Sequence, residues 1–279
     1  MSPNPISGHT SANSAFYEPA AGGFTATELT RGPWDGASQH AGPPAALLGR
    51  EIERLPGVGV APDDRIVGRV TFEILAPVPI GPMRVEAKVV RPGRRVDMVE
   101  ATLSDGAGRP LVRARAWRLL RREVELPGPL PIRDRPAPPP PEGLPEADEF
   151  FPTGYEVGYH TGMEYRFAEG SFTESGPGIV WMRMRHPLVS GEDPSPLQRV
   201  LIVADSGNGI SSTLDYRRYL FINVDLTVHL HRMPAGEWVC LDSVTVPEAT
   251  GVGLTDTVLF DESGPIGLAA QTLLVAGRE

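Results

Sequence analysis

Cysteine is nearly absent from this sequence. Cys240 is the only one among 279 residues, so no disulfide can form within the chain, and a cysteine-rich zinc site is excluded. The sequence also lacks a run of about 18 apolar residues, which a membrane-spanning helix would need. Its first residues show no basic stretch followed by an apolar one, so we expect no secretory signal and a cytoplasmic location.

Positive charge is also scarce. The 26 Lys and Arg residues face 35 Asp and Glu residues, giving a net charge of -9. A nucleic-acid partner would require a basic face, so none is expected. Eight arginines nevertheless gather in one part of the chain, and a solvated strand edge is the simplest interpretation of the group formed by Arg91, Arg94, Arg95, Arg113, Arg115, Arg118, Arg121 and Arg122.

Several catalytic signatures are missing as well. The sequence contains no Gly-x-Ser-x-Gly elbow, no phosphate-binding loop and no dinucleotide-binding fingerprint. A serine hydrolase is therefore not expected. Apolar residues make up 41% and charged residues 22% of the chain, which is typical of a soluble globular protein.

The end of the chain carries the clearest pattern. Apolar residues alternate from 222 to 230, which indicates a half-buried strand, and residues 238–246, 253–260 and 266–275 are expected to form three more. These four strands are predicted to form an antiparallel meander. Residues 66–120 repeat the same plan, with the loop 104–108 in the place of 260–264, and Arg115 then falls opposite Gln271.

Each repeat also contains a predicted helix. One starts at Gly42, where Pro43 and Pro44 are tolerated in the first turn, and a second follows Pro196 and ends near Gly207. An edge strand is expected at 24–30, and further strands at 155–167 and 178–186. We therefore expect an α+β fold of two repeats, each with a long helix wrapped by an antiparallel sheet. Residues 15–123 and 151–279 would form the two units, joined by a proline-rich linker at 124–150.

Three polar residues stand out in apolar surroundings. Asp205 shares a helix face with Leu201, so its carboxylate either reaches solvent near the helix end or is held in a polar pocket. Gln271 interrupts the apolar strand GLAAQTLLV. Asn223 interrupts another strand, although its parity places it with Asp225 on the outer face. For both amides, a solvent-facing position remains an alternative.

A histidine pair is a weaker candidate. His229 and His231 lie on one face of a strand with Asp225, as metal ligands could, but two ligands with an unknown third give a weak signal. A surface pair is the favoured interpretation, and no metal is expected.

Several segments together resemble the acyl-CoA thioesterase II-like proteins, the double-hotdog branch of the thioesterase superfamily. They are HAGPPAALL, PLQRVLIVADSGNG, NVDLTVHLHRMPAGEW and DESGPIGLAAQTLLV, within a resemblance spanning about residues 24–275. The resemblance implies a double hotdog and a catalytic set of Asp205, Gln271 and Asn223. Asn223 departs from the Thr or Ser of the family, and His40-Ala41-Gly42 stands where relatives commonly have Asn-Gly-Gly.

The implied activity is hydrolysis of an acyl-CoA thioester without metal or other cofactor. Asp205 would activate a water that Gln271 and Asn223 position, and the N–H of Gly42 would contact the oxyanion. A protein that binds acyl thioesters or lipid-like ligands without hydrolysis is the alternative, favoured by Asn223 and the altered helix start. A hydratase or dehydratase is disfavoured because no His lies near Asp205 in sequence. A homodimer is expected because antiparallel sheets with exposed edges often pair.

Overall fold

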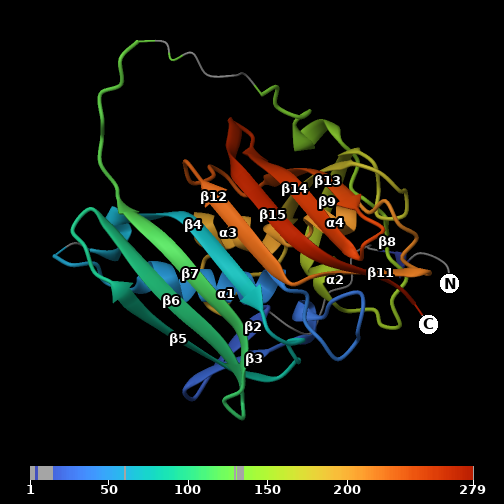
Figure 1. Ribbon diagram of the computed structural model, residues 1–279, viewed down its shortest axis with the longest axis horizontal. Helices are drawn as coiled ribbons and strands as arrows, with labels where there is room; N and C mark the ends of the chain where they lie inside the picture. Colours follow the sequence, from blue (N-terminus) through green and yellow to red (C-terminus); the bar gives the residue numbers. More distant parts are fainter. Residues whose placement is uncertain (1–3, 6–14, 60, 129, 131–134, 279) are drawn as a thin grey trace.

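The computed structural model describes residues 4–5, 15–59, 61–128, 130 and 135–278. Within them, a 13-stranded antiparallel sheet curves around two helices that lie behind it in Figure 1. The first half of the chain consists of β2 (Tyr17–Ala20), β3 (Gly23–Ala26), η1 (Glu28–Thr30), α1 (Gly42–Arg54), η2 (Pro62–Asp64), β4 (Arg65–Ile74), β5 (Pro82–Arg91), β6 (Val96–Asp105) and β7 (Pro110–Leu120).

The second half follows a long connection, which is the green loop at the top of Figure 1. It contains η3 (Pro141–Gly143), β8 (Glu149–Phe150), α2 (Tyr159–Gly162), β9 (Met163–Glu169), β10 (Gly178–Met184), α3 (Pro196–Ala204), α4 (Gly207–Ile210), β11 (Tyr219–Asn223), β12 (Asp225–Leu230), β13 (Val239–Pro247), β14 (Val252–Asp261) and β15 (Gly264–Gly277). A short strand β1 (Asn4–Pro5) pairs with β8.

The strand order has the same pattern from either end. It runs β2-β3-β5-β6-β7-β4-β12-β15-β14-β13-β10-β9, with β11 also pairing β15. Each half therefore contributes a hairpin, a helix and four further strands to this order, and the second half adds β11. The predicted meander was wrong in one respect, because β12 pairs with β15 and not with β13. Because β12 lies at the centre of the sheet, it pairs with β4 on its other side, and the strands of the two halves form one continuous sheet.

The two long helices pack against each other on the inner face of the sheet. Glycines on α1 allow this close approach: a Cβ at Gly49 would lie 2.3 Å from Leu201 Cδ1, and one at Gly42 would lie 2.1 Å from the carbonyl oxygen of Ile202. α1 also contacts β4 to β7, whereas α3 contacts β10, β12 and β13. The start of α1 therefore lies beside the end of α3.

Other expectations changed at the segment boundaries. The strand predicted at 155–167 begins only at Met163, because a helical turn precedes it in which Thr161 Oγ1 accepts a hydrogen bond from the N–H of Gly158. The expected edge strand at 24–30 covers only residues 23–26. Of the predicted linker 124–150, residues 129 and 131–134 lie outside the described residues. Trp181 Nε1 donates to the carbonyl of Pro139 at 2.7 Å, so this part contacts the second half.

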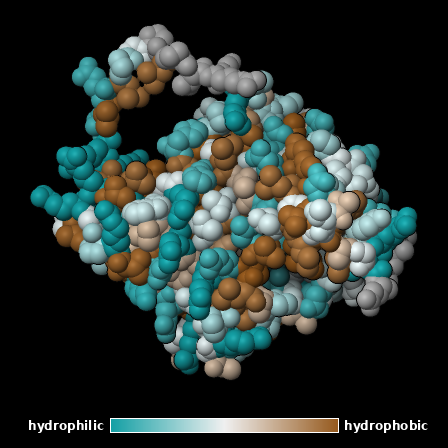
Figure 2. Space-filling view, in the orientation of Figure 1, coloured by the Kyte–Doolittle hydropathy of each residue, from teal (hydrophilic) through white to brown (hydrophobic). Residues whose placement is uncertain are grey.

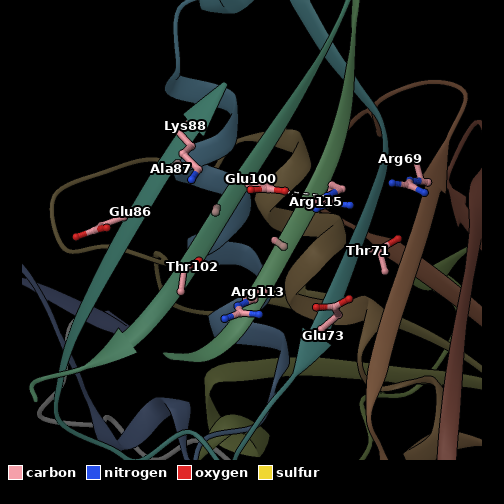
Figure 3. Close-up of a pocket in the computed structure, with 12 residues that line it drawn as sticks. Arg69, Thr71, Glu73, Glu86, Ala87, Lys88, Glu100, Thr102, Arg113 and Arg115 are labelled. Atoms are coloured by element: carbon pink, nitrogen blue, oxygen red, sulfur yellow. Dashed lines mark hydrogen bonds and ion pairs between the residues drawn. The ribbon is translucent and has the colours of Figure 1, made fainter. Parts of the chain in front are cut away.

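The outer face of β4 to β7 is strongly polar. A groove of about 710 Å³ lies there, and Figure 3 shows Arg115 paired with Glu100 among the side chains that line it. Arg115 therefore points away from the helices, whereas Gln271, its counterpart in the aligned repeats, is buried. Arg118 contradicts the prediction of a solvated arginine cluster, because it is fully buried. Figure 2 shows hydrophilic and hydrophobic side chains mixed over this side of the molecule.

None of the helices formed by the described residues combines the length and the apolar character that crossing a bilayer requires.

Candidate functional site

Asp205 caps the C-terminal end of α3, and only 5% of it is exposed. Its Oδ1 accepts two amide hydrogen bonds, from Asn223 Nδ2 at 2.7 Å and from Gln271 Nε2 at 3.2 Å. Hydrogen bonds from two donors stabilise a buried carboxylate and fix its plane. The structure thus brings the three residues implied by the family resemblance together, in the polar pocket that was one of the two alternatives for Asp205.

Gln271 is held at both ends. Its Nε2 also donates to the backbone oxygen of Asp205 at 3.1 Å, and its Oε1 accepts from the N–H of Asn208 at 3.1 Å. The close approach of α4 requires Gly207, since a Cβ there would lie 3.2 Å from Gln271 Oε1 and 2.7 Å from Thr257 Oγ1. All of these contacts are buried, so the side chain has one orientation.

Asn223 reaches the site because its strand is interrupted. Asn223 lies opposite Leu273 and Thr227 lies opposite Ala270, so four steps along one strand match three on the other. The extra residue at Val224, between β11 and β12, exchanges the inner and outer positions. Counting alternate residues back from β12 therefore predicted that Asn223 lies on the outer face, whereas it lies on the inner one.

His40 is a site residue that the sequence-based prediction missed. Its Nδ1 lies 3.3 Å from Asp205 Oδ2, and its ring stacks on Tyr159 with centroids 3.9 Å apart and an angle of 5°. Burial lowers the pKa of His40, and the negative charge of Asp205 opposes this effect. His40 precedes α1, over 160 residues before Asp205 in sequence, so only the packing of α1 against α3 reveals the pair.

Gly42 lies at the start of α1, as predicted, and its N–H donates to His40 Nδ1 at 3.1 Å. One nitrogen cannot accept this hydrogen bond and also donate to Asp205. The imidazole therefore either accepts from Gly42 with its proton on Nε2, or donates to Asp205 with its proton on Nδ1. Either arrangement links the helix start to the carboxylate.

The histidine pair lies elsewhere. His229 is exposed in β12, opposite Arg69 and Leu268, and Asp225 Oδ1 accepts from the N–H of Thr272 at 2.6 Å. In the described part of the chain, no group of three His, Cys, Asp or Glu residues is arranged to hold a metal ion.

Two sequence profiles match most of the chain. That of the acyl-CoA thioesterase N-terminal domain matches residues 30–119, and that of the C-terminal domain matches residues 134–275. The chain belongs to the acyl-CoA thioesterase family. This membership supports acyl-CoA thioester hydrolysis as its general activity. A comparison of this chain with curated proteins found no match.

Solved structures show the fold of this acyl-CoA thioesterase family member. A candidate thioesterase II from Thermobifida fusca YX is 18% identical, with a TM-score of 0.71 over 94% of this chain and 96% of its own. A hot dog fold protein from Alicyclobacillus acidocaldarius is 17% identical, with a TM-score of 0.66 and 92% of each chain covered. A candidate thioesterase from Novosphingobium aromaticivorans is 20% identical, with a TM-score of 0.65 over 93% and 98%. The fold is thus α+β of the hotdog type.

Proposed function

We propose that this protein hydrolyses a fatty-acyl or related acyl-CoA thioester to the free acid and CoA. The observation that supports this most is the buried arrangement of Asp205, whose Oδ1 is held by the amides of Asn223 and Gln271. A carboxylate fixed in this way can orient a water and take its proton as the water attacks a carbonyl carbon.

The two carboxylate oxygens have different roles in this proposal. Oδ1 receives both amide donors, so Oδ2, beside His40, is the atom available to a water. Attack by this water forms a tetrahedral oxyanion, and its proton moves to Asp205. Collapse of this intermediate breaks the C–S bond and releases CoA, whose thiolate takes the proton. The reaction as written uses neither a covalent enzyme intermediate nor a metal.

The oxyanion would be stabilised at the start of α1. The N–H of Gly42 is the candidate donor, since Pro43 and Pro44 have no N–H. It now donates to His40 Nδ1, so it becomes available when His40 carries its proton on Nδ1 and donates to Asp205. Asn223 contributes an amide where relatives have a hydroxyl, and in this proposal it positions Asp205.

The finer architecture belongs to the same proposal. The symmetric strand order and the separate matches of the two halves support a double hotdog, with units at 15–123 and 151–279 and a linker at 124–150. We further propose a homodimer located in the cytoplasm.

The test is release of free CoA from a panel of acyl-CoAs, short to long and straight to aromatic, by the wild type and by Asp205→Asn. Loss of the carboxylate should reduce kcat by at least about 100-fold, the usual contribution of a general base. Turnover by the wild type that Asp205→Asn retains in full would contradict the mechanism. Tight acyl-CoA binding without turnover on any substrate would favour the binding protein.

One observation supports a second candidate, a hydratase acting on an enoyl thioester. Such enzymes use an Asp–His pair, and the structure places His40 Nδ1 3.3 Å from Asp205 Oδ2 although the two are distant in sequence. The same panel should include an enoyl-CoA, followed by the absorbance of its conjugated double bond. Loss of this absorbance without release of CoA would establish the hydratase.

A further inference from the structure

A second groove lies at the opposite end of the helix pair. Asp205 lies where α3 ends and α1 begins, whereas this groove lies where α1 ends and α3 begins. Its volume is about 930 Å³, and its charged lining consists of Glu53, Arg54, Asp63, Arg65, Arg118, Arg121, His231 and Arg232. Apolar side chains, among them Ile66, Leu197 and Met233, form the rest of the wall.

The groove contains a counterpart of the candidate site. Glu53 lies in the last turn of α1, and Asp205 occupies the corresponding place at the end of α3. Its carboxylate accepts from Ser195 Oγ at 3.0 Å and from Gln198 Nε2 at 3.4 Å, both at the start of the other helix. Burial raises the pKa of Glu53, which favours the uncharged acid.

The base of the groove buries more positive than negative charge. Arg118 donates to both carboxylate oxygens of Asp97 at 2.9 Å, and Arg65 Nε lies 3.5 Å from the same carboxylate. All three side chains are at least nine-tenths buried. Two guanidinium groups thus share one carboxylate, and an excess buried charge is costly without a counter-ion.

Part of this excess charge has no hydrogen-bond partner in the part of the chain that the structure describes. Arg118 uses its remaining donors on the carbonyls of Ile52 and Leu55, at the end of α1. Arg65 Nη2 donates to the carbonyl of Gly93 at 2.7 Å, but Arg65 Nη1 has no hydrogen-bond partner among the described residues. Arg121, which is exposed, also lines the groove. The first turn of α3 also opens here and adds its positive helix end.

We propose that this groove is a second ligand site, separate from Asp205, which binds the phosphate group of a small organic phosphate through Arg65 and Arg121. Guanidinium groups match phosphate oxygens in geometry and charge. The apolar wall would receive the organic part of the ligand. Asp205 is held by two amides, whereas Glu53 is held by the single amide of Gln198 and by the hydroxyl of Ser195, so we assign binding and not hydrolysis to this site.

The test is titration calorimetry of the full chain with inorganic pyrophosphate and, in a separate arm, with hexanoate. We expect saturable pyrophosphate binding that weakens at least about tenfold in Arg121→Ala and in Arg65→Met, as for loss of a charge-assisted hydrogen bond. Arg113→Ala removes the same charge from the outer sheet face and should leave affinity unchanged, as should Asp205→Asn. CoA release by Arg121→Ala should equal that of the wild type.

Absence of pyrophosphate binding in the wild type would overturn the proposal. An equal loss of affinity in Arg113→Ala would do the same, since it would show that only net charge matters. Binding of hexanoate but not of pyrophosphate would show that the groove takes a carboxylate and not a phosphate, which would refute the proposed ligand class. If Arg65→Met does not fold, as judged by its circular dichroism, the exposed Arg121→Ala decides the result.

Discussion

Removal of the Asn223 side chain tests whether the position of Asp205 limits the reaction. The hydrogen bond from Asn223 Nδ2 to Asp205 Oδ1 measures 2.7 Å. Without it, Oδ1 keeps only the longer hydrogen bond from Gln271, at 3.2 Å. Hydrogen bonds to charged groups contribute about 1.5–3 kcal/mol. If that contribution acts on the transition state, Asn223→Ala should lower kcat/KM about 10- to 150-fold.

Steady-state release of CoA measures this effect, and the loss should fall on kcat because Asn223 holds the carboxylate and not the substrate. Asn208→Ala is the matched control. It removes an amide of the same kind, which donates to the carbonyl of Phe221 at 3.3 Å, and leaves the backbone N–H that holds Gln271. Unchanged kcat in Asn223→Ala, or an equal decrease in Asn208→Ala, would refute the positioning role.

Two further predictions concern stability. Gly42→Ala would place a Cβ 2.1 Å from the carbonyl oxygen of Ile202, so we expect a destabilisation of about 1–3 kcal/mol in denaturant unfolding, whereas Gly154→Ala, with open space around it, should cost little. Burial lowers the pKa of His160 to about 4, below its ordinary value of 6.5, so the unfolded chain binds this proton more readily. Stability should therefore decrease by up to about 3 kcal/mol as pH falls from about 6.5 to about 4, and His160→Phe should reduce this dependence.

The alternating apolar pattern was sufficient to predict most of the sheet strands, and the duplication remains a proposal. Strand existence depends on local periodicity, which 222–230 displays clearly, whereas 266–275 is apolar along most of its length. The pairing of β12 with β15 is a long-range choice that no local pattern encodes. For the same reason the predicted meander was wrong, and its first strand, 222–230, is divided at Val224 into β11 and β12.

The candidate site was likewise predictable only where local sequence carries the signal. Asp205 and Gln271 could be chosen because polar groups in apolar segments require partners, and each has them. The inward orientation of Asn223 depends on a single extra residue at Val224, and one residue reverses the face of every side chain beyond it. His40 could not be chosen from local sequence, because it meets Asp205 only where α1 crosses α3. The proposed roles of these residues remain predictions.

The two halves show why the proposed hydrolytic site occupies one end of the helix pair. In the aligned repeats Val67 takes the place of Asn223, and the pairing of β4 with β7 also shifts between Val67 and Arg69. The backbone irregularity is thus present in both halves and turns Val67 inward, where it is buried. The inward positions of β7 nearest to the counterpart of Gln271 are Ala114 and Ala116. The end near Glu53 therefore has the same backbone irregularity, but apolar side chains stand where Asn223 and Gln271 hold Asp205, and its buried arginines give it a different chemistry.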